Sequence, residues 1–199
     1  MGFELLMDSS NTELSIGVVE DNKLTYKTSF PAWQRQSELM IPELEKALNA
    51  TGKELKDVEK IVVGKGPGSY TGLRIAMTIA KVVGVLNGCK LVLVSSLQML
   101  GPVNEKFIAL MNARSGRSYI GVYDNGNTVL ADDIMTNDDV RKYIEEHQDF
   151  KVYGDTAYLG IEGNKPDIVE NLFLLKDKVE PEENNLKVKP VYLKENYEY

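Results

Sequence analysis

The sequence predicts an α/β fold in which mixed sheets are flanked by helices, and three observations lead to this expectation. Strand-like segments follow one another at the start of the chain, strands and helices then alternate, and the second half repeats this order more faintly. Alternating strands and helices are typical of parallel strands joined by right-handed crossovers. The 199 residues, of which 43% are hydrophobic, suffice for one large domain or two small ones.

Three neighbouring antiparallel strands are expected first, over residues 3–7, 14–19 and 24–30. The first is apolar and ends at the turn-forming cluster Asp-Ser-Ser-Asn at 8–11. The other two alternate apolar and polar residues, which is the period of a strand with one buried face. Asp21-Asn22 stands between them and suits a hairpin turn.

A helix is expected over residues 37–50, because apolar side chains return there at helical spacing. Pro42 fits such a helix only in its first turn or at a kink. The β-branched run 60–64 predicts a strand buried on both faces. A glycine-rich loop, a helix over 72–87 and another buried strand over 91–94 follow it.

The second half of the chain repeats the same types of element. Strands are expected over 107–111, 118–123, 128–131 and 151–154, with a helix from about 137 to 146 before the last strand. We place a soft boundary near residue 100. It divides the chain into an N-terminal lobe, 1–100, and a shortened C-terminal lobe, 101–199, which ends in an exposed linker at 180–185 and a tail.

Composition and charge exclude several classes of function. The net charge of −7 repels phosphate backbones, so the chain alone is expected to bind nucleic acid poorly. Cys89 is the single cysteine, which rules out an intrachain disulfide and indicates the reducing cytoplasm. No signal-peptide pattern opens the chain and no long apolar run occurs, so we expect neither secretion nor a membrane span.

His147 is the only histidine, so the usual His/Cys zinc site lacks its ligands. A Ser-His-Asp mechanism would have to use this residue. His147 stands in the charged run 145–149, and we interpret it as a solvated helix terminus. We therefore assign no catalytic residue and no metal ligand.

The glycine-rich loop 63–74 is the most informative stretch. It lies between a predicted strand and a predicted helix, where backbone N–H groups and the helix dipole can bind an anion, so one interpretation is a phosphate loop. Its spacing matches neither the Walker A loop nor the dinucleotide fingerprint. The alternative is a tight turn, in which at least one glycine has a positive φ angle. The residues of interest are Gly64, Gly66, Pro67, Gly68, Ser69, Thr71, Gly72 and Arg74.

Helix 72–87 is apolar nearly all round, whereas a surface helix is apolar over about 100° of arc. It is therefore either sandwiched in the core or covered by a partner. Ala76, Ala80 and Gly84 recur at four-residue spacing, which lets another helix approach closely. Together with helix 37–50 it supplies the candidate partner-binding residues Leu39, Met40, Leu44, Leu73, Ala76, Met77, Ala80 and Val83.

Residues 64–75 read GKGPGSYTGLRI and resemble the signature G-x-G-P-G-S-[FY]-T-G-[LV]-R of the TsaB (YeaZ) family. Other segments agree in the same order. The opening strand with its Asp-Ser-Ser turn resembles the family's Asp-Thr-Ser turn, and 94–97 resembles its V-S-[ST]-L. Residues 112–119 resemble its D-A-R-x-x-E-[VI]-Y, and 190–194 its P-x-Y-[LV]-R. The resemblance spans nearly the whole chain.

The resemblance implies an actin/hexokinase/Hsp70-like (ASKHA) fold of two RNase-H-like lobes. It implies a non-catalytic scaffold and activator in the complex that places threonylcarbamoyl-adenosine next to the tRNA anticodon. Its partners would be the catalytic subunit TsaD and the ATPase TsaE, with tRNA reached only through the complex. Helices 37–50 and 72–87 would form the interface with TsaD, or a homodimer of the isolated chain. No cofactor is implied, and any nucleotide would lie at the junction with the catalytic subunit.

The sequence departs from the family's pattern at three positions. Asn112 stands where an aspartate is common, Arg117, followed by Ser118, where an acidic residue is usual, and Gln36 where a histidine is frequent. The catalytic relative binds its metal through histidines on the helix that begins near Gln36, so their absence agrees with a non-catalytic role. The C-terminal lobe is also short for the family.

The main alternative is an ATP-dependent kinase or ATPase of the same superfamily. Such an enzyme needs a carboxylate at the end of the first strand to hold Mg²⁺, and Asp8 is in that place. We favour a different interpretation of Asp8, as a turn residue that caps its neighbours. A glycoprotease is disfavoured, because the chain lacks the metal ligands and the activated nucleophile that peptide hydrolysis requires.

Overall fold

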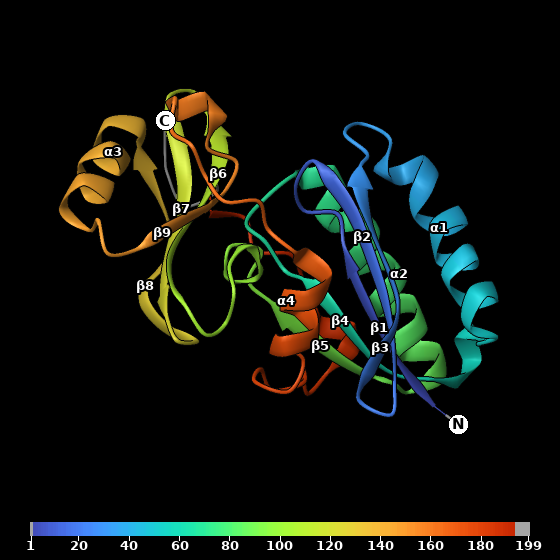
Figure 1. Cartoon of the computed structure of the whole chain (residues 1–199). Helices are drawn as coiled ribbons and strands as arrows, with labels where there is room; N and C mark the ends of the chain where they lie inside the picture. The colour runs from blue at the N-terminus through green and yellow to red at the C-terminus, as the bar shows by residue number, and fades with distance from the viewer. Residues whose placement is uncertain (1, 194–199) are drawn as a thin grey trace.

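The computed structural model describes residues 2–193 of the chain. Over this range nine β-strands and four α-helices form two sheets with their covering helices, set beside one another (Figure 1). Both sheets are mixed, as the sequence predicts.

The first sheet has the order β3-β2-β1-β4-β5, and its central strand is the first in the chain. The first three strands pair antiparallel, and β4 and β5 add in parallel. Asp21 and Asn22 both have positive φ, of 47° and 58°, as the predicted hairpin turn requires. The bounds are β1 (Phe3–Asp8), β2 (Glu13–Glu20), β3 (Lys23–Pro31), β4 (Val58–Gly64) and β5 (Lys90–Val94).

Two helices, α1 (Gln36–Thr51) and α2 (Tyr70–Asn87), cover one face of this sheet. Between them and the sheet lies an apolar core of the first lobe. Pro42 stands inside α1 rather than in its first turn. No helix within residues 2–193 combines the length and apolar character needed to cross a membrane.

The second sheet repeats the topology of the first without its fifth strand. Its order is β8-β7-β6-β9, with two antiparallel pairings and one parallel pairing. This repetition makes the chain two RNase-H-like lobes of the ASKHA fold. The bounds are β6 (Lys106–Arg114), β7 (Arg117–Asp124), β8 (Asn127–Thr136), α3 (Asn137–Glu146) and β9 (Lys151–Gly154).

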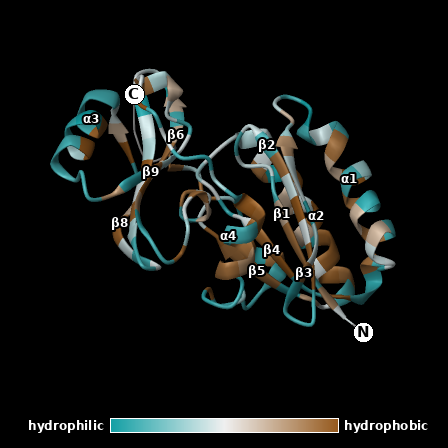
Figure 2. Ribbon diagram, in the orientation of Figure 1, coloured by the Kyte–Doolittle hydropathy of each residue, from teal (hydrophilic) through white to brown (hydrophobic). Residues whose placement is uncertain are grey.

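Helix α4 (Ile168–Leu175) was not anticipated from the sequence. It follows the second sheet but packs on the free face of the first, against β1, β2 and β3 (Figure 1). Asp167 caps its first turn by accepting from the N–H of Glu170. The helix is mostly hydrophobic (Figure 2), and its buried residues join a second core that reaches into the other lobe.

The end of the described chain also returns to the first lobe. Residues 180–184 are exposed, as expected of a linker, and residues 185–193 then run along α2. Val188 is buried in the core beneath α1 and α2. Lys194, the last residue of the P-x-Y-[LV]-R-like motif, lies outside the described residues.

Candidate functional site

The glycine-rich loop joins β4 to α2 and packs on the turn that follows β1. Gly66 has a φ of 108°, which confirms that the loop needs glycine for its backbone conformation. Two further glycines are required by close packing. A Cβ on Gly68 would lie 2.3 Å from the carbonyl oxygen of Ser10, and one on Gly72 would lie 1.8 Å from that of Ser9.

Several polar groups of this loop are bonded within the protein. The N–H of Ser69 donates to the carbonyl of Ser10 at 2.7 Å, and Ser9 Oγ donates to the carbonyl of Gly72 at 2.7 Å. Ser69 Oγ caps α2 by accepting from the N–H of Gly72 at 3.2 Å. Because carbonyl oxygens of the β1 turn occupy the space before α2, this loop does not fit a phosphate.

Asp8 ends β1 and is 1% exposed. Its Oδ2 accepts from the N–H and the hydroxyl of Ser10, at 3.1 and 3.0 Å, so the carboxyl caps its own turn as the sequence predicts. Burial raises the pKa of Asp8 from 3.8 to about 7, against the opposing effect of these hydrogen bonds. A carboxyl held in this way is poorly placed to hold Mg²⁺.

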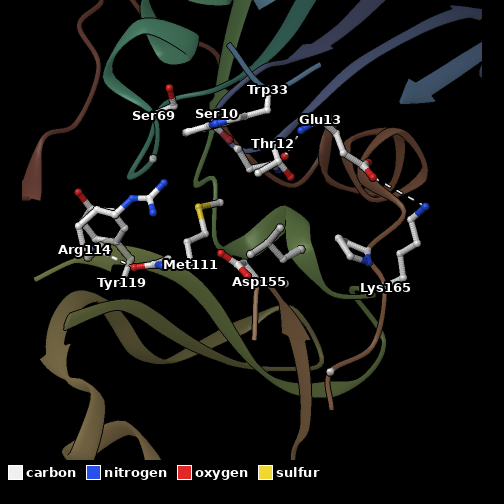
Figure 3. A pocket seen from close by; sticks show the side chains of 18 of the residues that line it. Ser10, Thr12, Glu13, Trp33, Ser69, Met111, Arg114, Tyr119, Asp155 and Lys165 are labelled. Carbon is white, nitrogen blue, oxygen red and sulfur yellow. Dashed lines mark hydrogen bonds and ion pairs between the residues drawn. The ribbon is translucent and has the colours of Figure 1, made fainter. Parts of the chain in front are cut away.

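A cleft of about 610 Å³ lies between the two lobes. Figure 3 shows Ser10, Thr12 and Trp33 of the first lobe on one side and Met111 and Tyr119 of the second lobe on the other. Polar and charged side chains line the cleft together with apolar and aromatic ones. Asp8 is not among the residues that line the cleft.

Charged side chains bridge the mouth of the cleft. The guanidinium of Arg114 lies 5.8 Å from the centre of the Trp33 ring, and Lys165 Nζ lies 3.7 Å from a Glu13 carboxylate oxygen (Figure 3). Burial raises the pKa of Asp155, and the charge of Arg114 partly opposes this shift. Of these residues only Arg114 stands out in the sequence, through the family's D-A-R motif.

A half-buried hydrogen-bonded cluster links the two lobes. Ser95, after β5, donates to Asp132 Oδ2 at 2.5 Å, and the Tyr123 hydroxyl donates to Asp132 Oδ1. Burial raises the pKa of Asp132 and of Tyr123 above their ordinary values. Ser95 also accepts from the N–H of Leu97 at 3.1 Å, so one side chain orders the connection between lobes.

His147 stands at the end of α3, as predicted, but it is half-buried rather than solvated, because its ring stacks on Tyr143 with centroids 4.0 Å apart. Its Nδ1 lies 2.8 Å from the Tyr143 carbonyl oxygen. Across residues 2–193, no group of three or more His, Cys, Asp or Glu side chains is arranged to hold a metal ion.

The structure places the candidate partner-binding residues mainly in the core. Leu39 is partly buried, and the other seven are buried under the two helices, because they face the first sheet. They can support a partner surface only by positioning the helices. The buried residues are Met40, Leu44, Leu73, Ala76, Met77, Ala80 and Val83.

A different set of apolar side chains on α2 faces outward. We call this set the outer stripe. Val82, Val85 and Leu86 are exposed, by 51%, 47% and 77%, and Ile75 and Ile79 are partly buried beside them. Ile41 is the exposed apolar residue of α1. Exposed apolar residues that gather on one helix side are typical of an interaction site.

Side chains at or next to the three departures from the family pattern have local structural roles. Gln36 is buried and donates from Nε2 to the carbonyl of Asn11 at 2.9 Å, so it fixes the turn at the cleft rim. Asn112 Oδ1 accepts from the N–H of Arg114 at 2.8 Å. Ser118 is buried, where its hydroxyl donates to Asn137 and accepts from Tyr158.

Comparison with known proteins points to one family. Residues 31–151, more than half of the chain, match the family model described as TsaD, tRNA N6-adenosine threonylcarbamoyltransferase. The tRNA threonylcarbamoyladenosine biosynthesis protein TsaB of Bacillus subtilis is 33% identical over 130 residues, which are 63% of this chain and 57% of that protein. This match therefore spans less than two thirds of the Bacillus protein.

Two further likenesses cover nearly the whole chain. The uncharacterized protein MG208 homolog of Mycoplasma pneumoniae is 26% identical over 97% of this chain and 95% of its own length. The solved structure of YeaZ from Pseudomonas aeruginosa superposes with a TM-score of 0.77 at 20% identity, covering 97% of this chain and all of that one. The chain therefore matches the TsaD sequence model and belongs, by its relatives, to the TsaB (YeaZ) family.

Proposed function

We propose that this chain is the non-catalytic scaffold and activator subunit of a tRNA threonylcarbamoyladenosine modification complex in the cytoplasm. It binds a TsaD-like catalytic subunit and a TsaE-like ATPase, and it meets tRNA only within that complex. In isolation it pairs with a second copy of itself. We also propose that the chain divides into an N-terminal lobe, 1–100, and a C-terminal lobe, 101–199. The tail of the C-terminal lobe returns to the N-terminal lobe.

The outer stripe is the observation that carries this proposal. Covering an exposed Leu or Val removes apolar surface from water, which stabilises a complex by about 25 cal/mol for each Å². Residues 31–151 match the TsaD model, and this range contains both helices. A TsaD-like subunit is thus expected to carry an equivalent helix pair, and two related subunits can pair like surfaces about an approximate two-fold axis.

The chemistry of the chain supports a role without catalysis. The β1 turn fills the space before α2, Asp8 is buried and capped, and His147 lies at a surface helix end. The net charge of −7 disfavours direct contact with the tRNA backbone. A partner therefore has to supply both the catalytic groups and the positive surface.

An ATP-binding enzyme of the same superfamily is the second candidate, and the inter-lobe cleft favours it. Trp33 and Tyr119 offer aromatic faces there, and Arg114 offers a cation. A steady ATP hydrolysis rate of the purified chain, lost in Asp8→Ala, would support this candidate against the scaffold. We expect no rate above background.

Co-purification tests the proposal. A tagged chain expressed in its own cells should bring a TsaD-like subunit with it. Val82→Glu should abolish this, because a partner would bury an unpaired carboxylate, at a cost of about 3–5 kcal/mol. Val129→Glu is the matched control, since Val129 on β8 is 54% exposed and Val82 is 51% exposed. If both variants recover the partner equally, the outer stripe of α2 does not bind it.

A further inference from the structure

The segment 185–193, which we call the strap, lies along the flank of α2. Asn185 anchors it near the end of the helix, where its Nδ2 donates to the carbonyl oxygens of Gly84 and Cys89 at 3.0 and 2.9 Å. A Cβ on Gly84 would lie 2.9 Å from that Nδ2 atom. Gly84 therefore makes room for the chain's own strap, not for the helix of a partner as the sequence spacing had indicated.

The strap is also anchored at its middle and at its far end. Val188 is buried in the first-lobe core. The N–H of Val191 donates to the carbonyl of Lys65 in the glycine loop at 2.7 Å. The ring of Tyr192 packs on that of Tyr70, at the start of α2, with centroids 5.1 Å apart. Three separate anchors thus hold the strap along most of the helix.

Leu186 is the most exposed apolar side chain of this ordered segment. Leu186 is 64% exposed, although the residues on either side of it hold the backbone in place. It lines a surface hollow together with Val85 of the outer stripe, and charged side chains such as Lys90 and Glu182 form the other side of this hollow. Leu186 therefore lies beside one end of the outer stripe.

We propose that Leu186 is a contact residue for the TsaD-like subunit, so that the partner surface consists of α2 and the strap together. This inference rests on the proposed function. Its position beside the outer stripe favours the same occupant, a subunit related to this chain. An anchored segment also loses little conformational freedom on binding, so its apolar contact contributes more of its free energy to affinity.

The test is the affinity of the purified full-length chain for the TsaD-like subunit, measured by calorimetry. Leu186→Ser should weaken binding about tenfold, as expected for one well-covered apolar contact. Lys187→Ser is the control, since Lys187 is also exposed on the strap and should leave affinity unchanged. Asn185→Ala should weaken binding as well, because it releases the anchor of Leu186.

The outcomes separate this inference from the proposed function. Unchanged affinity of Leu186→Ser, with binding lost in Val82→Glu, would overturn the role of the strap and leave the helix surface in place. If Val82→Glu still binds the TsaD-like subunit, the outer stripe of α2 is not the binding surface. A Leu186→Ser variant that loses only self-association would identify a second copy as the occupant and overturn the inference.

Discussion

Gly72, in the first turn of α2, packs against the carbonyl oxygen of Ser9, and a Cβ at this position would lie 1.8 Å from that oxygen. Ser9 Oγ in turn donates to the carbonyl of Gly72 at 2.7 Å. The start of the helix and the end of β1 are thus locked together. The glycine signature is explained by this packing within the chain.

Gly72→Ala should destabilise the fold by about 2–3 kcal/mol, because a buried backbone oxygen cannot move away without breaking the turn. Gly88→Ala is the comparison. Gly88 has nothing within 4 Å of its Cβ position but a φ of 67°, so its replacement should cost about 1 kcal/mol. Urea unfolding measures the free energy of unfolding of both variants. A Gly72→Ala variant as stable as Gly88→Ala would contradict the close packing of Gly72 on Ser9.

Asp8 should make stability fall as pH rises. Its folded pKa is raised from 3.8 to about 7, so the folded protein keeps a proton that the unfolded chain releases. The stability that this proton confers is complete below pH 4 and is lost as pH rises through 7. The difference of about 3 pKa units corresponds to roughly 4 kcal/mol.

Asp8→Asn removes this titration and supplies the measurement. The free energy of unfolding of wild type should fall relative to that of Asp8→Asn between pH 4 and pH 8, and then level off. A difference between the two proteins that stays constant over this range would show that Asp8 is ionised at neutral pH in the folded chain.

Tyr123→Phe should cost about 1–3 kcal/mol, because it removes a donor from the half-buried carboxylate of Asp132. It should also speed hydrogen exchange where the lobes meet, since Ser95 of the first lobe bonds the same carboxylate. Tyr143→Phe is the control: that ring stacks on His147 at the surface. If both variants match wild type, the cluster does not hold the lobes together.

Gly84→Ala should fail to stabilise α2. Alanine in place of glycine within a helix normally gains about 1 kcal/mol. Here the new Cβ would lie 2.9 Å from Asn185 Nδ2 and 3.0 Å from Leu91 Cδ2, so we expect a loss. In an Asn185→Ala background the loss should shrink. The melting temperatures of wild type, the two single variants and the double variant test this. If the effects of the two substitutions simply add, Gly84 and Asn185 do not interact and the strap contact is contradicted.

Most of the fold could be predicted from local sequence. Every expected strand is present, because alternating or β-branched runs are bounded by turn residues such as Asp21-Asn22. The N-terminal cap of α3, Thr136, which accepts from the N–H of Asp139, could also be predicted from the sequence. Helix α4 was missed because its place depends on a tertiary contact: Asn171 donates to the Met99 carbonyl, 72 residues away in sequence.

The candidate site was less predictable. Periodicity identified an apolar helix but could not tell the side that faces the sheet from the side that faces outward. The prediction therefore named Ala80, which is 0% exposed, and omitted Val82 and Leu86. The strap and the inter-lobe cluster join residues far apart in sequence, and only the folded chain shows that Asn185 reaches Gly84.

Ala80→Glu illustrates the correction. A carboxylate buried between α2 and the sheet should unfold the chain, because an unpaired buried charge costs several kcal/mol. Val82→Glu should leave the melting temperature near that of wild type. Thermal unfolding followed by circular dichroism distinguishes the two variants. A folded Ala80→Glu protein would contradict the assignment of Ala80 to the core.

The most direct test is formation of threonylcarbamoyl-adenosine on tRNA in a reconstituted system of TsaD-like and TsaE-like subunits, with this chain added or withheld. The account predicts product only when the chain is present, full activity with Val129→Glu, and none with folded Val82→Glu. Undiminished product without the chain, or with Val82→Glu, would contradict the proposed role of this chain as a scaffold that acts through α2.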